Sequence, residues 1–175
     1  MPASPDKIVL SEGVARVPGM SSTWRHLPVA ARPIAAATEA AVTAARGRDS
    51  EALVQAVGDL GAADPAQVGL ILGTGVRLLL EDHHPDGLTG DDVREVLQSS
   101  VRAAAQWQPE VDPHVMLILL AGALGVHDDD GEPPPKPEVL ARHAALLIAD
   151  QLGAGSIRDY LDRALGEIER TQLND

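Results

Sequence analysis

Residues 68–80 have the sequence VGLILGTGVRLLL, and residues 115–126 have the sequence VMLILLAGALGV. Both runs are apolar on nearly every side of a helix, which is typical of helices buried at the centre of a domain. They predict two central helices that pack on each other. Neither run reaches the roughly 20 apolar residues of a membrane-spanning helix.

Glycines interrupt both runs, although each glycine inside a helix costs about 1 kcal/mol relative to alanine. Gly69 and Gly73 share one helix face, and so do Gly122 and Gly125. Close helix–helix contact at these faces would explain the cost. The alternatives are that these glycines line a ligand cavity or permit a kink.

The chain after residue 31 carries helical signals and no convincing strand pattern. Helix starts are indicated at Asp64-Pro65, at Asp112-Pro113, at the capping box of Thr89 and Asp92, and at Ser156. The predicted helices span 33–46, 50–60, 65–82, 90–107, 113–126, 137–152 and a final segment from 157. The predicted fold is therefore all-α: a single domain of six or seven helices, in antiparallel helical hairpins packed around the two apolar central helices.

Residues 1–31 are predicted to form an N-terminal arm, partly extended or disordered, ahead of the helical domain at 32–175. Four prolines interrupt this arm, and Trp24 is its expected anchor. Residues 1–48 carry a net charge of +3, whereas residues 49–175 carry −15. The arm could dock on an acidic body, in the same chain or in a neighbour. The simpler interpretation is a solvated surface with a mobile tail.

The composition excludes several classes of function. A net charge of −12 argues against binding to the nucleic-acid backbone, which requires a basic face. The absence of cysteine excludes disulfides, cysteine-ligated zinc and a thiol nucleophile. The first residues lack a basic segment followed by an apolar run, so we expect no signal peptide, no membrane association and a cytoplasmic location. The scarcity of lysine and the abundance of alanine and glycine suggest a bacterial source.

Two acidic segments contain histidines: LEDHHPDGLTGDDV at 80–93 and VHDDDGEPPPKPE at 126–138. Because short connections make consecutive helices antiparallel, these segments are expected at the same end of the domain. Carboxylates with imidazoles suit Zn²⁺, Mn²⁺ or Fe, and carboxylates alone suit Ca²⁺ or Mg²⁺. The candidate ligands for a divalent metal are His83, His84, Asp86, His127, Asp128 and Asp130.

The run Asp82-x-His84-x-Asp86-Gly87 resembles the first half of an EF-hand loop. However, Val93 stands where that loop has its bidentate glutamate. The same residues also suit a capped connection between two helices, since acidic residues in a first turn favour the helix dipole. A polar turn is therefore the alternative to a metal site.

His143 falls on the apolar face of the helix predicted at 137–152. A buried imidazole needs a hydrogen-bond partner, so a core histidine bonded to a backbone carbonyl or a nearby Asp is one interpretation. The other is a residue in the wall of a ligand pocket. No nucleophile elbow, phosphate-binding loop or zinc-protease motif is present, which argues against an enzyme.

These observations favour a non-enzymatic protein-interaction module. It is expected to bind a protein partner or a second copy of itself, which would make it a homodimer. One alternative is a metal-binding or metal-dependent protein that uses the acidic segments 81–92 and 127–132. A further alternative is a small-molecule-binding protein with a pocket between its helices. No cofactor other than a divalent metal is indicated.

Overall fold

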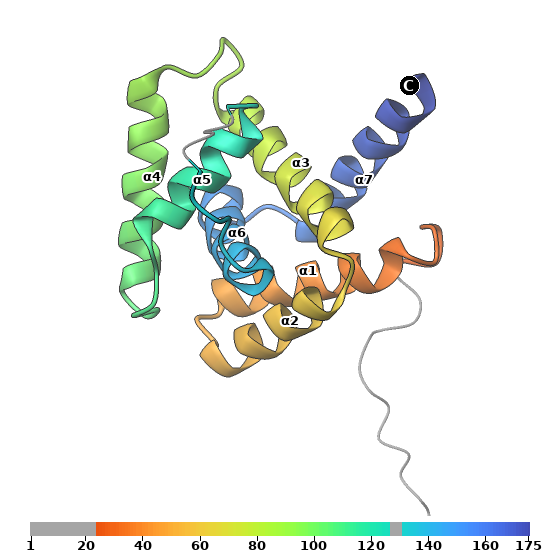
Figure 1. Ribbon diagram of the computed structural model, residues 1–175, viewed down its shortest axis with the longest axis horizontal. Helices are drawn as coiled ribbons and strands as arrows, with labels where there is room; N and C mark the ends of the chain where they lie inside the picture. The colour runs from red at the N-terminus through yellow and green to blue at the C-terminus, as the bar shows by residue number, and fades with distance from the viewer. Residues whose placement is uncertain (1–23, 127–130) are drawn as a thin grey trace, which may run out of the picture.

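The structure is a computed structural model that describes residues 24–126 and 131–175. Within these ranges it contains seven α-helices and no strand (Figure 1), so the all-α prediction is confirmed. The helices are α1 (Ala31–Arg46), α2 (Ser50–Ala62), α3 (Pro65–His83), α4 (Gly90–Ala105), α5 (Pro113–Ala123), α6 (Pro137–Leu152) and α7 (Ile157–Asn174). No helix in the described ranges is long and apolar enough to cross a bilayer.

Local capping residues start the helices where the sequence predicts them. Asp64 and Asp112 accept hydrogen bonds from the first backbone N–H groups of α3 and α5, each ahead of a proline. Thr89 and Asp92 complete the capping box of α4, and Ser156 caps α7. Each of these side chains satisfies an N–H group that has no partner inside its helix.

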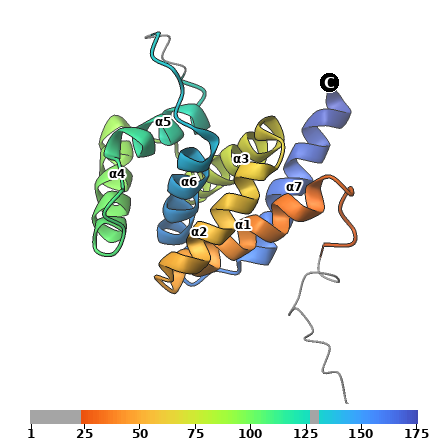
Figure 2. The same cartoon turned by 60° about the horizontal axis from the view of Figure 1, so that its bottom comes forward.

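The centre of the bundle is α6, which contacts α1, α2, α3, α4 and α5 (Figure 1). Figure 2 shows α6 between α4 and α5 on one side and α1 and α3 on the other. Its buried residues are Ala141, His143, Ala144, Ala145, Leu146, Leu147 and Ile148. The alanines let neighbouring helices approach closely, which explains how one helix contacts five others.

The helices α3 and α5 pack against each other, as the sequence predicts. However, α5 buries only Val115, Met116 and Leu120, and it lies at the edge of the bundle (Figure 1). The second central helix is therefore α6 rather than α5. Apolar composition marks a helix that avoids water, but it does not identify what covers that helix.

The predicted close contact at four glycines is wrong. A Cβ atom on Gly69, Gly73 or Gly122 would meet nothing within 4 Å. Gly125 has a φ of 73°, which closes the turn after α5 and suits glycine. Close approaches between helices occur instead at Gly61 of α2, against Glu138 of α6, and at Gly75 of α3, where a Cβ atom would lie 2.7 Å from the Tyr160 hydroxyl of α7.

Trp24 ties the segment before α1 to the bundle. Its side chain is buried, as is that of Leu27. The indole N–H donates to Glu39 of α1 at 3.2 Å, and the same carboxylate accepts a hydrogen bond from Arg158 of α7 at 2.6 Å. Trp24 therefore anchors this segment, as expected.

Candidate functional site

The end of α3 and the loop that follows it carry three of the predicted metal ligands. His83 is exposed, with its Nδ1 atom 3.3 Å from Gln151 Oε1 of α6. The Nδ1 atom of His84 lies 3.8 Å from Asp92 Oδ1, and Asp86 is exposed. Within residues 24–126 and 131–175, no three His, Asp or Glu side chains lie close enough to hold a metal ion. The other predicted ligands, His127, Asp128 and Asp130, lie outside the described residues.

Two acidic residues that flank this loop, Asp82 in the last turn of α3 and Asp92 in the first turn of α4, have structural partners. Asp82 forms a two-pronged ion pair with Arg163 of α7, with both N···O distances at 2.6 Å. Asp92 accepts hydrogen bonds from the backbone N–H and the hydroxyl of Thr89, both at 2.7 Å. The hydrogen bond from Arg163 lowers the pKa of Asp82, and the backbone hydrogen bond from Thr89 lowers the pKa of Asp92. This geometry supports the interpretation of the loop as a capped turn.

Acid is expected to destabilise the protein partly through Asp82. A carboxyl group whose pKa is lower in the folded state stabilises the fold above its unfolded-state pKa. That stabilisation is lost as the pH falls through the folded-state pKa. The melting temperature should therefore fall below about pH 4, and Asp82→Asn should make the fall shallower. Because the Asp82 and Arg163 side chains are 42% and 47% exposed, solvent screening keeps the effect modest.

Thermal melts followed by circular dichroism between about pH 7 and pH 3 measure this dependence. Asp86→Asn is the matched control, because Asp86 lies just after α3, close to Asp82 in the chain, and is exposed. It should leave the acid dependence unchanged. The same acid dependence in Asp82→Asn as in the unsubstituted chain would contradict the prediction.

His143 of α6 is a buried residue with both ring nitrogens occupied. Its Nε2 atom accepts a hydrogen bond from the backbone N–H of Asp112 at 2.9 Å. Its Nδ1 atom lies 2.7 Å from the carbonyl oxygen of Val139, to which it must donate. These partners define a neutral ring with its proton on Nδ1. His143 thus links α6 to the residue that caps α5.

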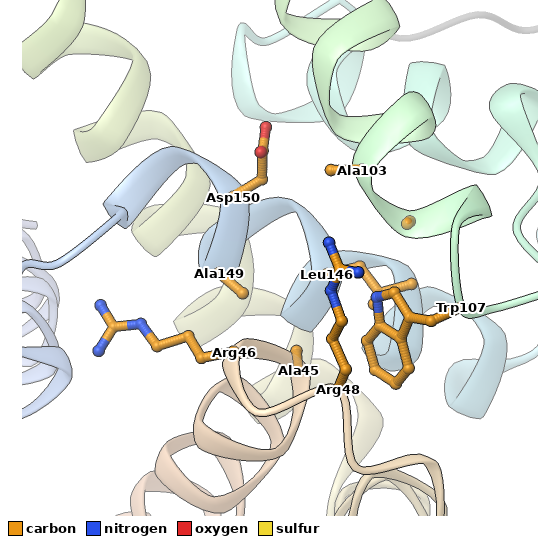
Figure 3. A pocket seen from close by; sticks show the side chains of 9 residues that line it. Ala45, Arg46, Arg48, Ala103, Trp107, Leu146, Ala149 and Asp150 are labelled. Carbon is orange, nitrogen blue, oxygen red and sulfur yellow. The ribbon is translucent and has the colours of Figure 1, made fainter.

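A pocket of about 110 Å³ opens between the C-terminal ends of α1 and α4 and the middle of α6 (Figure 3). Its lining residues are Ala45, Arg46, Arg48, Ala103, Ala104, Trp107, Leu146, Ala149 and Asp150. His143 is not one of them. Four alanines, a leucine and the flat indole of Trp107 supply the apolar part of the wall, and polar atoms line an equal part of it.

The three charged side chains that line the pocket point in different directions. Figure 3 shows the guanidinium of Arg48 beside Trp107, whereas the head groups of Arg46 and Asp150 point away from it. Arg48 donates to Gln106 Oε1 of α4 at 2.7 Å, and Arg46 donates to the carbonyl oxygen of Gly155. The positive charge nearest the indole is therefore that of Arg48.

A second feature is the outer side of α5 and the turn that follows it. Leu117, Leu124 and Val126 are 43%, 39% and 59% exposed. Leu117 lies on α5, and Leu124 and Val126 belong to the turn that follows it. We call these three residues the α5 surface. Large apolar side chains that remain exposed to water are typical of a protein contact when they form one patch.

Comparison of the chain with protein-family models, with curated proteins and with solved structures finds no match in any of the three. The geometry of the described residues is therefore the basis for a functional proposal.

No pattern in the sequence singles out Arg48 or Trp107. They are 59 positions apart in the chain, and only the packing of α1 and α4 on α6 brings them to one pocket. One local signal lies beside Arg48: Gly47 directly follows the last turn of α1. That signal predicts a helix end and gives no indication of a binding site.

Proposed function

We propose that this protein is a non-enzymatic helical module that acts through protein contacts, and that the α5 surface joins two copies of the chain. The observation that supports the proposal is the exposure of Leu117, Leu124 and Val126 on the most apolar of the seven described helices and its following turn. Burying such side chains in a contact contributes about 25 cal/mol per Å² of apolar area.

The charge distribution permits a second copy as the partner at α5. The chain carries a net charge of −12, so most pairs of identical surfaces would bring like charges together. The helix α5 has the sequence PHVMLILLAGA and contains no acidic or basic residue other than His114. Two copies can therefore meet at α5 with little electrostatic repulsion, in a two-fold contact of the commonest kind.

Light scattering after size-exclusion chromatography tests the proposal. We expect about twice the 18.3 kDa chain mass at about 100 µM protein. The double variant Leu117→Glu, Leu124→Glu should be monomeric. The matched control is Val54→Glu on α2, which places the same charge at a residue that is 59% exposed elsewhere on the surface. It should remain dimeric.

Two further measurements distinguish a dimer that forms through the α5 surface from a dimer that forms through the N-terminal arm. An apolar contact should persist at about 0.5 M salt, whereas a contact between opposite charges should weaken. Removing residues 1–23 should leave the dimer intact. The deletion stops there because Trp24 and Leu27 are buried in the bundle. A monomeric unsubstituted chain, or a dimer that survives the double substitution, would contradict the proposal.

A further inference from the structure

We infer that the pocket between α1, α4 and α6 is a binding site for a small anion with a flat apolar body, and that the chemical class it fits best is an aromatic carboxylate. This inference is independent of the α5 surface. It rests on the hydrogen-bond donors of Arg48 and on the shape of the pocket wall beside them.

Arg48 has spare capacity to bind an anion. Within residues 24–126 and 131–175, no carboxylate lies within ion-pair distance of its guanidinium, and its hydrogen-bond partner is the neutral side chain of Gln106. Six arginines elsewhere form ion pairs: Arg77, Arg94, Arg142, Arg158, Arg163 and Arg170. A guanidinium has five N–H donors in a planar fork that matches a carboxylate. One bond to Gln106 leaves the rest of that fork available.

The wall beside this charge suits a flat ring. Trp107 presents its indole, and alanines and Leu146 supply the other apolar groups of a wall whose remaining half is polar (Figure 3). The volume of about 110 Å³ is smaller than the roughly 150 Å³ cavity that holds benzene in another protein. Because this pocket is open, part of a six-membered ring can remain in solvent. A carboxylate on that ring would then face Arg48.

The acidic residue in the pocket wall does not oppose such a ligand directly. The Asp150 carboxylate accepts hydrogen bonds from Ser99 at 3.1 Å, Ser100 at 2.8 Å and Gln151 at 2.9 Å. These donors hold the head group away from Arg48 (Figure 3). Three hydrogen bonds also disperse its negative charge.

The backbone conformation of Arg48 ends α1. Arg48 has a φ of 52°, and the backbone N–H groups of Arg48 and Asp49 donate to the carbonyl oxygens of Ala45 at 3.2 Å and Ala44 at 2.9 Å. This is the Schellman cap of a helix, which needs a left-handed residue at this position. Glycine would adopt the same conformation without steric cost.

The test uses benzoate as the probe and Trp107 as the reporter. The chain contains two tryptophans, so Trp24→Phe leaves Trp107 as the single source of indole fluorescence. Benzoate should quench that fluorescence to saturation at about millimolar concentration. Benzamide, which has the same shape and no charge, should bind at least about tenfold more weakly.

Arg48→Gly is the decisive variant, because it removes the guanidinium and relieves the backbone strain. We expect it to weaken benzoate binding at least about tenfold while the melting temperature stays the same or rises. Arg102→Ala is the matched control, since Arg102 is an exposed cation on α4 that does not line the pocket. It should leave binding unchanged.

Ligand-observed NMR of benzoate with the unsubstituted chain and with Arg48→Gly gives the same comparison without Trp24→Phe. No saturable benzoate binding below about 10 mM would overturn the inference. Equal binding of benzamide, or unchanged binding in Arg48→Gly, would also overturn it. Tighter binding of inorganic phosphate than of benzoate would overturn the assignment of an aromatic body.

Discussion

Replacing His143 by alanine is expected to lower the free energy of unfolding by about 3 to 4 kcal/mol. The substitution leaves a cavity beside the central helix, because the His143 side chain is 2% exposed. It also leaves the backbone N–H of Asp112 without its acceptor. A buried donor without a partner costs about 1 to 3 kcal/mol, so this partly buried one should contribute toward the low end of that range, and the lost packing adds to the cost. Urea denaturation followed by circular dichroism measures the loss.

Two variants show whether the hydrogen bond is the cause. His143→Gln carries an amide oxygen that can accept from Asp112, so we expect it to lose only about 1 to 2 kcal/mol. His114→Ala removes an imidazole that is 65% exposed on the first turn of α5, and it should change stability by less than about 0.5 kcal/mol. A loss of less than about 1 kcal/mol in His143→Ala would show that the interhelical bond contributes little.

Gly75→Ala is expected to destabilise the protein by about 1 to 2 kcal/mol, although alanine is the better helix former. A Cβ atom at this position would lie 2.7 Å from the Tyr160 hydroxyl oxygen. That oxygen terminates a rigid ring that is buried between α3 and α7, so relief requires the helices to move apart. The cost of overpacking, about 1 to 3 kcal/mol, should exceed the gain of about 1 kcal/mol in helix propensity.

Tyr160→Phe should reverse the sign of this effect. Among the described residues the Tyr160 hydroxyl has no hydrogen-bond partner, and its burial raises its pKa, so it remains a neutral donor. Removing the hydroxyl should be neutral or stabilise the fold by about 1 kcal/mol. In that background the nearest ring carbon, Cζ, lies 3.4 Å from the new Cβ atom, which is nearly an ordinary contact. Gly75→Ala should then stabilise the protein by about 0.5 to 1 kcal/mol.

Gly73→Ala is the matched control for this cycle. Gly73 lies two residues away on α3, and a Cβ atom there would meet nothing within 4 Å. It should stabilise the protein by about 1 kcal/mol with either Tyr160 or Phe at position 160. Additive effects of Gly75→Ala and Tyr160→Phe would contradict the proposed contact.

The helices and their starts follow from the sequence because they depend on neighbouring residues. A capping side chain reaches only two or three residues along the chain, as Asp64 and the Thr89–Asp92 box do. The end of α5 was less predictable, since the helix was expected to reach residue 126 and stops at Ala123. The positive φ of Gly125 ends the helix. The apolar run continues to residue 126, so the hydrophobic pattern does not indicate where the helix stops.

The sequence also predicts that His143 is buried and bonded to a backbone carbonyl. That carbonyl belongs to Val139, one turn earlier in the same helix. The partner of its other nitrogen, the N–H of Asp112, is 31 residues away. The residue that faces Nε2 depends on how α5 packs on α6, so no local sequence pattern predicts that partner.

What the sequence determined by itself is the set of helices, because hydrogen bonds within a helix, capping and the spacing of apolar residues all act over a few positions. The tertiary structure decided which helix is central, which apolar face stays exposed, which glycine is in close contact and where a pocket forms. Each of these depends on the shapes of surfaces that the chain brings together from distant positions. The alanines of α6, the partly exposed leucines of α5 and the meeting of Arg48 with Trp107 all result from that packing.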